Sequence, residues 1–447
     1  MENSLTKMID ENSDRLSNLP DALLIHILSL LDAKKVVQTC LLSKRWRNLW
    51  ASVPSLHFNY EYLSNESERF SNFLTSFLHL RDKAINLHTF KLCYYGSRTC
   101  ASSMHCSALS NTEAFSIDEM WILYAFKHEV KNLVLKFWEN CFKVAPNCLF
   151  TCDSLEYMQF NSFSEVKADI VCLPKLRKLS LRNVSMNGDS IHKILSGCPV
   201  LETLSIQFVT IRTNSISFQT VKSLRMENCF FYSLSEPTIS ISCPCLNYLK
   251  FVQCTGAITF TDMSRVTDAI ITWGKNCKKG YNFDLLEDIL GVEYLELIIV
   301  YAKEFLDRQL KNGTTFYGLK CLLLDLCWNN CNFSILSSFL RRCPKLEKFC
   351  LLHTTYSCEV CCCEEKTLGN KWQVCCCGEE TLENTWLQIE GFSCQELNIV
   401  KVVSCQVDQR QCAHQLEKLV LQRKKEIGIT SLSSLTQEKL VLQQNSL

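Results

Sequence analysis

Residues 197–206 read Gly-Cys-Pro-Val-Leu-Glu-Thr-Leu-Ser-Ile, and the spacing of their apolar residues decides the fold. Leu201, Leu204 and Ile206 follow the pattern Leu-x-x-Leu-x-Leu, whose end alternates apolar and polar residues as a half-buried β-strand does. The pattern recurs along the chain with some substitution. Its other copies begin at Val130, Leu155, Leu176, Val221, Leu246, Val292, Leu319 and Leu346, with a weaker copy at Val266.

Successive copies begin 25, 21, 25, 20, 25, 20, 26, 27 and 27 residues apart when the weak copy is counted. Spacings of about 20–29 residues are typical of leucine-rich repeats. We therefore predict an α/β fold, a curved leucine-rich-repeat solenoid with parallel strands and alternating long and short repeats. A longer repeat has room for a helix, such as one over Ser190–Ser196, and a shorter one only for a turn. The regular spacing disfavours an unrelated α/β fold with leucine-rich strands.

The residues between the apolar strand positions are expected to line the concave side of the solenoid. These residues are polar in the early repeats and become less polar in the later ones, so an apolar patch is predicted toward the end of the solenoid. A loop or the C-terminal tail covering that patch is the alternative. The residues predicted to bind a target are Arg182, Arg225, Tyr294, Ile298, Leu323 and Leu352.

The stretch before the repeats, residues 14–58, predicts three short helices. Pro20 fits a first helical turn, Asp32 is a suitable cap for a second helix, and Ser43 for a third that carries Trp46 and Trp50. So small a unit has more apolar side chains than it can bury alone, which indicates a surface completed by a partner. The alternative is an ordinary helical domain that packs its leucines and tryptophans on the rest of the chain.

Leu19-Pro20-Asp21, Ile27-Leu28 and the run from Leu42 to Trp50 resemble the F-box of plant F-box/leucine-rich-repeat proteins. Gly197 to Leu204 resembles the repeats of the same family. The resemblance implies docking on the Skp-type adaptor of a Skp–cullin–F-box ubiquitin ligase. The contact residues that it implies are Leu19, Pro20, Leu24, Ile27, Leu28, Val37, Leu41, Trp46, Leu49 and Trp50, with a basic rim of Lys34, Lys35, Lys44, Arg45 and Arg47. Ala22 departs from the acidic residue usual in the family.

Before the repeats, we predict a helix that carries Phe70, Phe77 and Leu78 and a first strand at Leu87–Leu92. Two closing strands are expected around Leu397–Val402 and Leu416–Leu421. The predicted organisation of the whole chain has seven parts. The parts are a flexible N-terminus (1–13), the F-box (14–58), a connecting and capping segment (59–125), the solenoid (126–356), a cysteine-rich duplicated loop (357–386), C-terminal closing repeats (387–427) and a flexible tail (428–447).

The 29 cysteines are expected to be reduced, because the N-terminus lacks the pattern of a secretory signal. Cys229, Cys254 and Cys327 each follow a strand by three residues, where a leucine-rich repeat places Asn or Cys inside the turn. In the duplicated loop, Cys358 and Cys361 have a zinc-like spacing. Three adjacent cysteines cannot all reach one ion, however, so a mobile acidic loop with exposed thiols is favoured and no metal or cofactor is predicted.

No catalytic motif or membrane-spanning stretch is found in the sequence, and the net charge of +1 favours neither nucleic acid nor an acidic membrane as a partner. We expect a cytoplasmic or nuclear protein that is not an enzyme. The leading hypothesis is a substrate-recognition adaptor whose repeats present a target protein for ubiquitination. The alternative is an F-box scaffold, or an inactive duplicate, that acts outside the ligase.

Overall fold

The computed structural model describes residues 16, 18–61, 67–95, 119–137, 142–166, 169–273, 285–299, 315–326, 342–353 and 399–404. The chain divides into two compact units. The first comprises Met1–Lys250, Cys254–Met263 and Gly280–Phe283, and the second comprises the remaining residues up to Leu447. Each unit is described by itself.

The first unit begins with short helices, α1 (Asp21–Leu28) and α2 (Ala33–Gln38), and two 3-10 helices, η1 (Thr39–Leu41) and η2 (Trp46–Ser52). Pro20 precedes α1, and the Asp32 carboxylate caps α2 by accepting a hydrogen bond from the Lys34 N–H at 2.9 Å. The predicted side-chain cap at Ser43 is wrong. Because η2 is a tight 3-10 helix that starts after Arg45, only the Ser43 carbonyl takes part, accepting from the Trp46 N–H.

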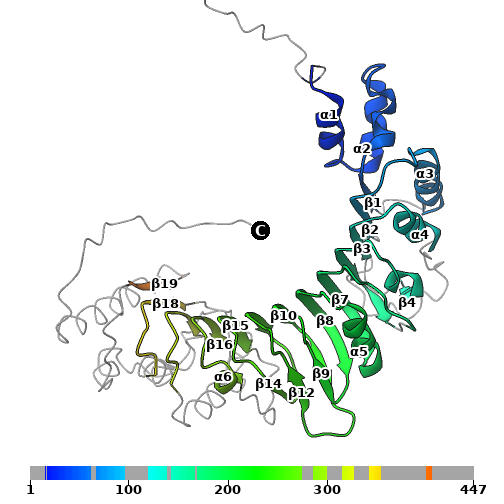
Figure 1. Cartoon of the computed structure of the whole chain (residues 1–447). Coiled ribbons are helices and arrows are strands. Elements are labelled where there is room, and N and C mark those ends of the chain that lie inside the picture. The colour runs from blue at the N-terminus through cyan, green and yellow to red at the C-terminus, as the bar shows by residue number, and fades with distance from the viewer. Residues whose placement is uncertain are drawn as a thin grey trace, which may run out of the picture. The chain divides into compact units, whose positions relative to one another are not determined.

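Parallel strands then form a sheet (Figure 1). From β1 to β10, each apolar repeat position pairs with the same repeat position of the neighbouring strand. In sheet order they are β1 (Ser55–Glu61), β2 (Thr89–Tyr95), β3 (Asn132–Phe137), β5 (Tyr157–Asn161), β7 (Lys178–Asn187), β8 (Thr203–Arg212), β10 (Ser223–Glu227) and β13 (Tyr248–Val252). Leu204 and Ile206 pair with Leu224 and Met226. The repeat period therefore translates directly into strand register, and the predicted solenoid is confirmed.

Helices α3 (Ser67–Leu80), α4 (Glu119–Lys127) and α5 (Gly188–Gly197) lie on one side of this sheet (Figure 1). The Phe77 ring of α3 stands edge-on to the ring of Phe58 in β1, with ring centroids 5.3 Å apart. The strand predicted at Leu87–Leu92 is confirmed as β2, but it is not the first strand, because β1 precedes it with Leu56, Phe58 and Tyr60 buried. Helix α4 was not predicted either.

The segments that connect the strands depart from the predicted alternation of helix and turn. The long repeat that starts at Leu176 contains α5, as expected. The long repeat that starts at Val221 contains β11 (Phe230–Tyr232) and β12 (Ile239–Ser242) in place of a helix. Its residues alternate buried and exposed, which suits a strand. Strand β12 pairs with β9 (Ser215–Ser217) and β14 (Ile258–Thr261), while β4 (Phe142–Val144) pairs with β6 (Phe163–Glu165) near η5 (Asn147–Phe150).

Tight turns follow the sheet strands, and two residues show why they close. The buried thiol of Cys229 donates to the Ile206 carbonyl at 3.3 Å, inside the turn, as predicted. Gly256 has a φ of 133°, and a Cβ atom there would lie 2.5 Å from the Phe231 carbonyl oxygen, so only glycine fits. Cys254 is also buried, whereas Cys327 lies outside the described residues.

The second unit repeats the same construction. Strands β15 (Asp268–Trp273), β16 (Tyr294–Ile299), β17 (Cys321–Leu326), β18 (Lys348–His353) and β19 (Ile399–Ser404) pair in parallel, and α6 (Leu285–Asp288) precedes β16. The weak copy at Val266 and the closing strand at Leu397–Val402 are thereby confirmed as strands. The predicted strand at Leu416–Leu421 and the duplicated loop at 357–386 lie outside the described residues.

Candidate interaction surfaces

The N-terminal helices enclose a small core of their own. Its buried members come from α1, α2, η2 and the residue after η2, and they leave little room for further side chains. They are Leu24, Leu28, Val36, Trp46, Leu49 and Val53. Leu19, Ile25, Leu31 and Trp50 pack partly against it. Trp50 also meets the Phe77 ring of α3 at a centroid distance of 5.1 Å, so this tryptophan faces the repeats.

Other leucines of the same helices remain in solvent. Leu41 is 85% exposed, Leu42 65% and Leu23 50%, and Leu30 is exposed as well. A monomeric unit of this size gains nothing from several exposed leucines, so they indicate a surface that another protein covers. We call Leu23, Leu41 and Leu42, with the exposed Pro20, the leucine surface.

Of the ten residues predicted to contact an adaptor, four lie in the core: Leu24, Leu28, Trp46 and Leu49. Pro20 and Leu41 are exposed, and Leu19, Ile27, Val37 and Trp50 are half-buried. Leu23 and Leu42 were not among the ten. Adjacent leucines such as Leu23 and Leu24 look alike in sequence, and a helix can point only one of them into a core.

The predicted basic rim is partly structural. Arg45 donates from Nε to the Asp21 carboxylate at 2.9 Å and from its guanidinium to the Leu19 carbonyl. These bonds tie the η2 segment to the start of α1. Lys34, Lys35, Lys44 and Arg47 are exposed, as a rim requires.

Two further contacts join the helical module to the first strands. Asp32 accepts from the backbone N–H of Asn59 at 3.1 Å and from its side-chain amide at 2.9 Å. The buried Arg81 guanidinium donates to the carbonyls of Val53 and Ile85 at 3.3 and 2.8 Å. A buried cation satisfied by carbonyls is expensive to displace, so the module is held firmly on the start of the sheet.

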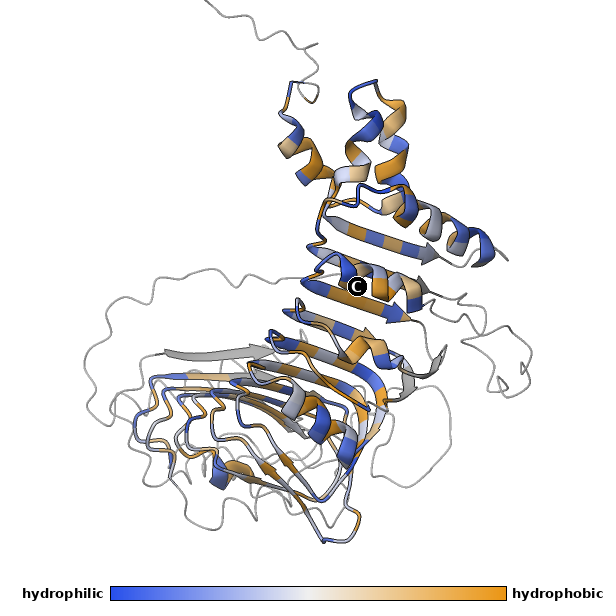
Figure 2. Ribbon diagram, turned by 45° about the vertical axis from the view of Figure 1, so that its right-hand side comes forward, coloured by the Kyte–Doolittle hydropathy of each residue, from blue (hydrophilic) through white to orange (hydrophobic). Residues whose placement is uncertain are grey.

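The other candidate surface is the face of the first-unit sheet opposite α3, α4 and α5. Hydrophobic and hydrophilic residues alternate along its strands (Figure 2), and in β8 the burial alternates in step. Lys178, Arg182 and Arg225 project from β7 and β10 and are exposed. We call these three residues and the positions between them the cationic face.

One acidic residue lies among these positions, and it is already paired. The Glu227 carboxylate lies 2.7 Å from Lys250 Nζ and accepts from the Gln207 amide at 3.3 Å. Among the described residues, no carboxylate forms an ion pair with Lys178, Arg182 or Arg225. Within the part of the chain that the structure describes, these three positive charges therefore have no ion pair.

Aromatic rings hold both arginines of the cationic face. The Arg182 guanidinium lies over the Phe208 ring at 5.3 Å, and that of Arg225 lies over the Tyr248 ring at 5.4 Å. Stacking on a ring orients a guanidinium without neutralising its charge, so its N–H groups stay available for a carboxylate. Only the two arginines of this set were predicted as binding residues. The rings were missed.

The four remaining predicted target residues belong to the second unit. Tyr294 and Ile298 in β16 and Leu323 in β17 are half-buried on one face. Leu352 lies in β18, and its side chain is outside the described residues. Burial, with the neighbouring Glu296 second, raises the pKa of Tyr294 to about 12, so its hydroxyl stays protonated and donates to Glu296 at 3.4 Å. Ile298 and Leu323 are the apolar part of this face, and Glu296 lies between Tyr294 and Ile298 on the same strand.

The buried thiols are structural. Burial raises the pKa of Cys198 and of Cys243 to about 12. Both side chains are inaccessible to solvent. Because the thiolate is the reactive form, these residues act as small apolar core side chains, not as nucleophiles.

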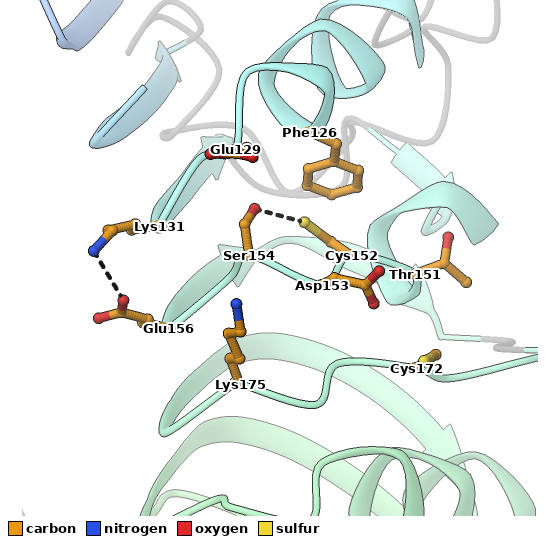
Figure 3. A pocket seen from close by; sticks show the side chains of 10 residues that line it. All are labelled: Phe126, Glu129, Lys131, Thr151, Cys152, Asp153, Ser154, Glu156, Cys172 and Lys175. Atoms are coloured by element: carbon orange, nitrogen blue, oxygen red, sulfur yellow. Dashed lines mark hydrogen bonds and ion pairs between the residues drawn. The ribbon is translucent and has the colours of Figure 1, made fainter. Parts of the chain in front are cut away.

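A pocket of about 630 Å³ lies in the first unit between the end of α4 and the loops before β5 and β7 (Figure 3). The Lys131–Glu156 ion pair, at 3.2 Å, lies at one edge of it (Figure 3). The Ser154 hydroxyl donates to the Val130 carbonyl at 2.9 Å, and the Cys152 thiol lies 3.3 Å from Ser154 Oγ. The ten lining residues include no histidine, so this pocket holds no nucleophile beside an imidazole base.

The described part of the chain has neither a membrane-spanning helix nor a cluster of metal-ligating side chains. Its helices are all too short or too polar to cross a lipid bilayer. No three His, Cys, Asp or Glu side chains lie close enough together there to hold a metal ion. The zinc hypothesis for Cys358 and Cys361 lies outside the described residues.

The helical module and the repeat solenoid together define a class of protein, an F-box joined to leucine-rich repeats. Comparison with protein families agrees. The F-box domain matches residues 16–58, and the LRR repeats of FBD-associated F-box protein At5g56370 match residues 119–269.

Three curated relatives from Arabidopsis thaliana show the same organisation in their names. F-box/LRR-repeat protein At3g26922 is 33% identical over 64% of this chain and 90% of its own length. F-box/LRR-repeat protein 25 is 32% identical over 57% of this chain and 91% of its own length. Putative F-box/FBD/LRR-repeat protein At4g13965 is 31% identical over 77% and 76%. The chain belongs to the F-box/LRR-repeat family.

Proposed function

We propose that this chain is a non-catalytic substrate-recognition subunit of a Skp–cullin–F-box ubiquitin ligase. F-box/LRR proteins typically act in such ligases, and F-box domains generally bind Skp-type adaptors. In this proposal, the F-box docks on the adaptor and the repeats hold a target protein near a ubiquitin-charged enzyme. The rate gain comes from proximity and not from chemistry on this chain.

The observation that carries the proposal is the leucine surface. The core of the module is complete with Leu24, Leu28 and Trp46, yet Leu23, Leu41 and Leu42 lie in solvent. A few large apolar side chains at the centre of a contact supply most of its binding free energy. Lys34, Lys35, Lys44 and Arg47 then form the rim, where charge speeds encounter with an acidic partner.

In this proposal, burial divides nine of the ten predicted contact residues into three groups, and Trp50, which packs on Phe77, is left out. Pro20 and Leu41, with Leu23 and Leu42, would touch the adaptor directly. Ile27, Val37 and Leu19 would contribute from the edge, being half-buried. The buried four, Leu24, Leu28, Trp46 and Leu49, would support the surface by holding the helices in place.

The test is co-purification of the full chain with a Skp-type adaptor. A Leu41→Ala/Leu42→Ala variant should lose adaptor affinity by at least about tenfold, because exposed side chains are removed without opening the core. The matched control is Leu80→Ala/Leu123→Ala, which removes two exposed leucines from α3 and α4. This control should bind as the wild type does.

Two results would count against the proposal. The first is a folded wild-type chain that does not bind the adaptor. The second is equal loss of binding in the Leu41/Leu42 variant and in the control, which would mean that the leucines act through general stickiness.

A further inference from the structure

Residues in the left-handed backbone conformation end the face-lining segments of four successive sheet strands, β5, β7, β8 and β10. Ser162 directly follows β5 with a φ of 64°, and Asn228 directly follows β10 with a φ of 52°. Asn183 and Phe208 lie within β7 and β8, directly after the face residues of those strands, with φ values of 52° and 53°. Asparagine is enriched in this conformation, whereas a bulky aromatic residue is strained in it. Phe208 is therefore the one apolar residue among these four, and Gln253, which follows β13 with a φ of 49°, is polar as well.

Phe208 is also in solvent, with 44% of its surface exposed. An exposed aromatic ring in a strained conformation contributes little to folding. Strain of this kind persists where a binding site needs the side chain. The ring instead supports the Arg182 guanidinium, at 5.3 Å from the centroid.

A second exposed cation–π pair continues this edge. Strand β11 pairs with the outer part of β8, and it places Arg212 over Tyr232 at 5.8 Å. Phe230, Tyr232 and Leu234 are all exposed. The cationic face thus borders a rim of exposed apolar side chains that begins on β8, and both features belong to the first unit.

We propose that the cationic face and Phe208 bind an acidic segment of the target protein, with carboxylates on Arg182 and Arg225 and an apolar side chain on Phe208. This inference rests on the proposed function, because it names the chemistry of the target. Charge complementarity selects the occupant, since Lys178, Arg182 and Arg225 lack acidic partners among the described residues and the sole face carboxylate is paired.

The strand geometry sets the spacing of the carboxylates. Arg182 and Arg225 lie two strands apart and two residues out of register, because Arg225 aligns with Ser205 and hence with Ser180. With strands about 4.8 Å apart and a rise of about 3.3 Å per residue, their Cα atoms are about 12 Å apart. An extended segment covers that distance in about four residues.

A protein segment fits this surface better than a nucleic acid does. A phosphate backbone carries a negative charge every few ångströms and is met by many cations. On the cationic face, three cations have no ion pair with a described carboxylate, Ser180, Ser205 and Ser223 lie between them, and an apolar rim lies at one edge. Two arginines on rings suit discrete carboxylates, and a rim suits an apolar neighbour.

The test uses the full chain and a labelled peptide of about eight residues, the length of the four-residue span with flanks. The peptide has two glutamates about four positions apart and a leucine between them. Its control has glutamines in place of the glutamates. Wild type should bind the glutamate peptide at least about tenfold more tightly, and added salt should shrink the difference.

Two variants locate the contact. Arg182→Gln/Arg225→Gln and Phe208→Asn should each weaken binding of the glutamate peptide about tenfold or more. The matched control Lys127→Gln/Lys193→Gln removes two exposed charges from α4 and α5 and should bind like the wild type. All variants should still bind the Skp-type adaptor, which shows that the chain is folded.

Three outcomes would overturn the inference and leave the proposed function standing. They are equal binding of the glutamate and glutamine peptides, equal weakening by the Lys127/Lys193 control, and tighter binding of a single-stranded oligonucleotide than of the glutamate peptide. Failure of the wild-type chain to bind the adaptor would instead contradict the proposed function.

Discussion

Both units are built from parallel repeat strands, but equivalent positions on their sheet faces carry different residues. In the first unit, β7 and β10 carry Arg182 and Arg225 on the sheet face. In the second unit, the corresponding positions of β16 and β17 include Ile298 and Leu323. The inward positions are alike, as Leu204 and Leu295 are both fully buried. The buried residues therefore determine the fold, while the face residues are free to vary with the partner.

The largest expected effect is on the free energy of unfolding, and it distinguishes core-facing residues from residues on the sheet face. Leu204→Ala in the first unit should lower the free energy of unfolding by about 2–5 kcal/mol, because it opens a cavity in a packed core. Leu323→Ala in the second unit makes the same chemical change on a half-buried face and should lower it by less than about 1.5 kcal/mol. Denaturant unfolding of each variant measures both values. Equal losses would mean that another segment covers Leu323 as completely as a core.

The next effect concerns pH and the buried thiols of the first unit. The pKa of Cys198 and of Cys243 is raised to about 12 in the folded chain, so the folded state holds these protons more tightly than the unfolded state does. Their contribution is fully present below the unfolded pKa, about 8.5, and is lost as the pH rises toward 12. Each thiol should lower stability by about 1.4 kcal/mol per pH unit in that window.

Its control is Cys198→Ala/Cys243→Ala, measured by urea unfolding between about pH 8 and 10. This variant starts less stable but should lose less stability over the interval than the wild type. In the second unit, burial raises the pKa of Cys321, whose side chain is only half-buried, so Cys321→Ala should change the pH slope less. Identical slopes in all three proteins would contradict this account of the thiols.

The smallest expected effect is an increase in stability. Phe208→Asn should raise the free energy of unfolding by up to about 1 kcal/mol, because asparagine accepts the left-handed conformation more readily. The reciprocal change, Asn228→Phe, places an aromatic residue at the equivalent position of β10 and should be destabilising by a similar amount. Thermal unfolding compares the two. Destabilisation by Phe208→Asn would show that the ring contributes to folding and not to binding.

Much of the fold was predictable because the core residues recur at fixed spacing. Even the weak copy at Val266 became a paired strand, since Ala269 and Ile271 keep the buried positions. Helix α4 was missed because Met120, Trp121, Ile122, Leu123 and Tyr124 are consecutive and hide the helical period. Strand β1 was missed because Leu56 and Phe58 alternate without the leading part of the repeat pattern.

The candidate surfaces were harder to predict than the core. The identity of a residue does not say which of Leu23 and Leu24 points inward, because the rotation of α1 is set by packing against Trp46 and Leu49. The role of Phe208 depends on its backbone angle and on the side chain of Arg182, which is 26 positions earlier in the sequence. The orientation of Leu23 and Leu24 and the role of Phe208 can therefore be assigned only from the three-dimensional structure.

The most direct test asks whether one chain bridges both partners. A Skp-type adaptor is immobilised, the full chain is added, and the labelled glutamate peptide is measured on the support. Wild type should retain the peptide. Leu41→Ala/Leu42→Ala should leave both chain and peptide in solution, still bound to each other, whereas Arg182→Gln/Arg225→Gln should hold the chain on the support without the peptide. Retention of the peptide by both variants, or by neither variant nor wild type, would contradict a chain with separate adaptor-binding and target-binding surfaces.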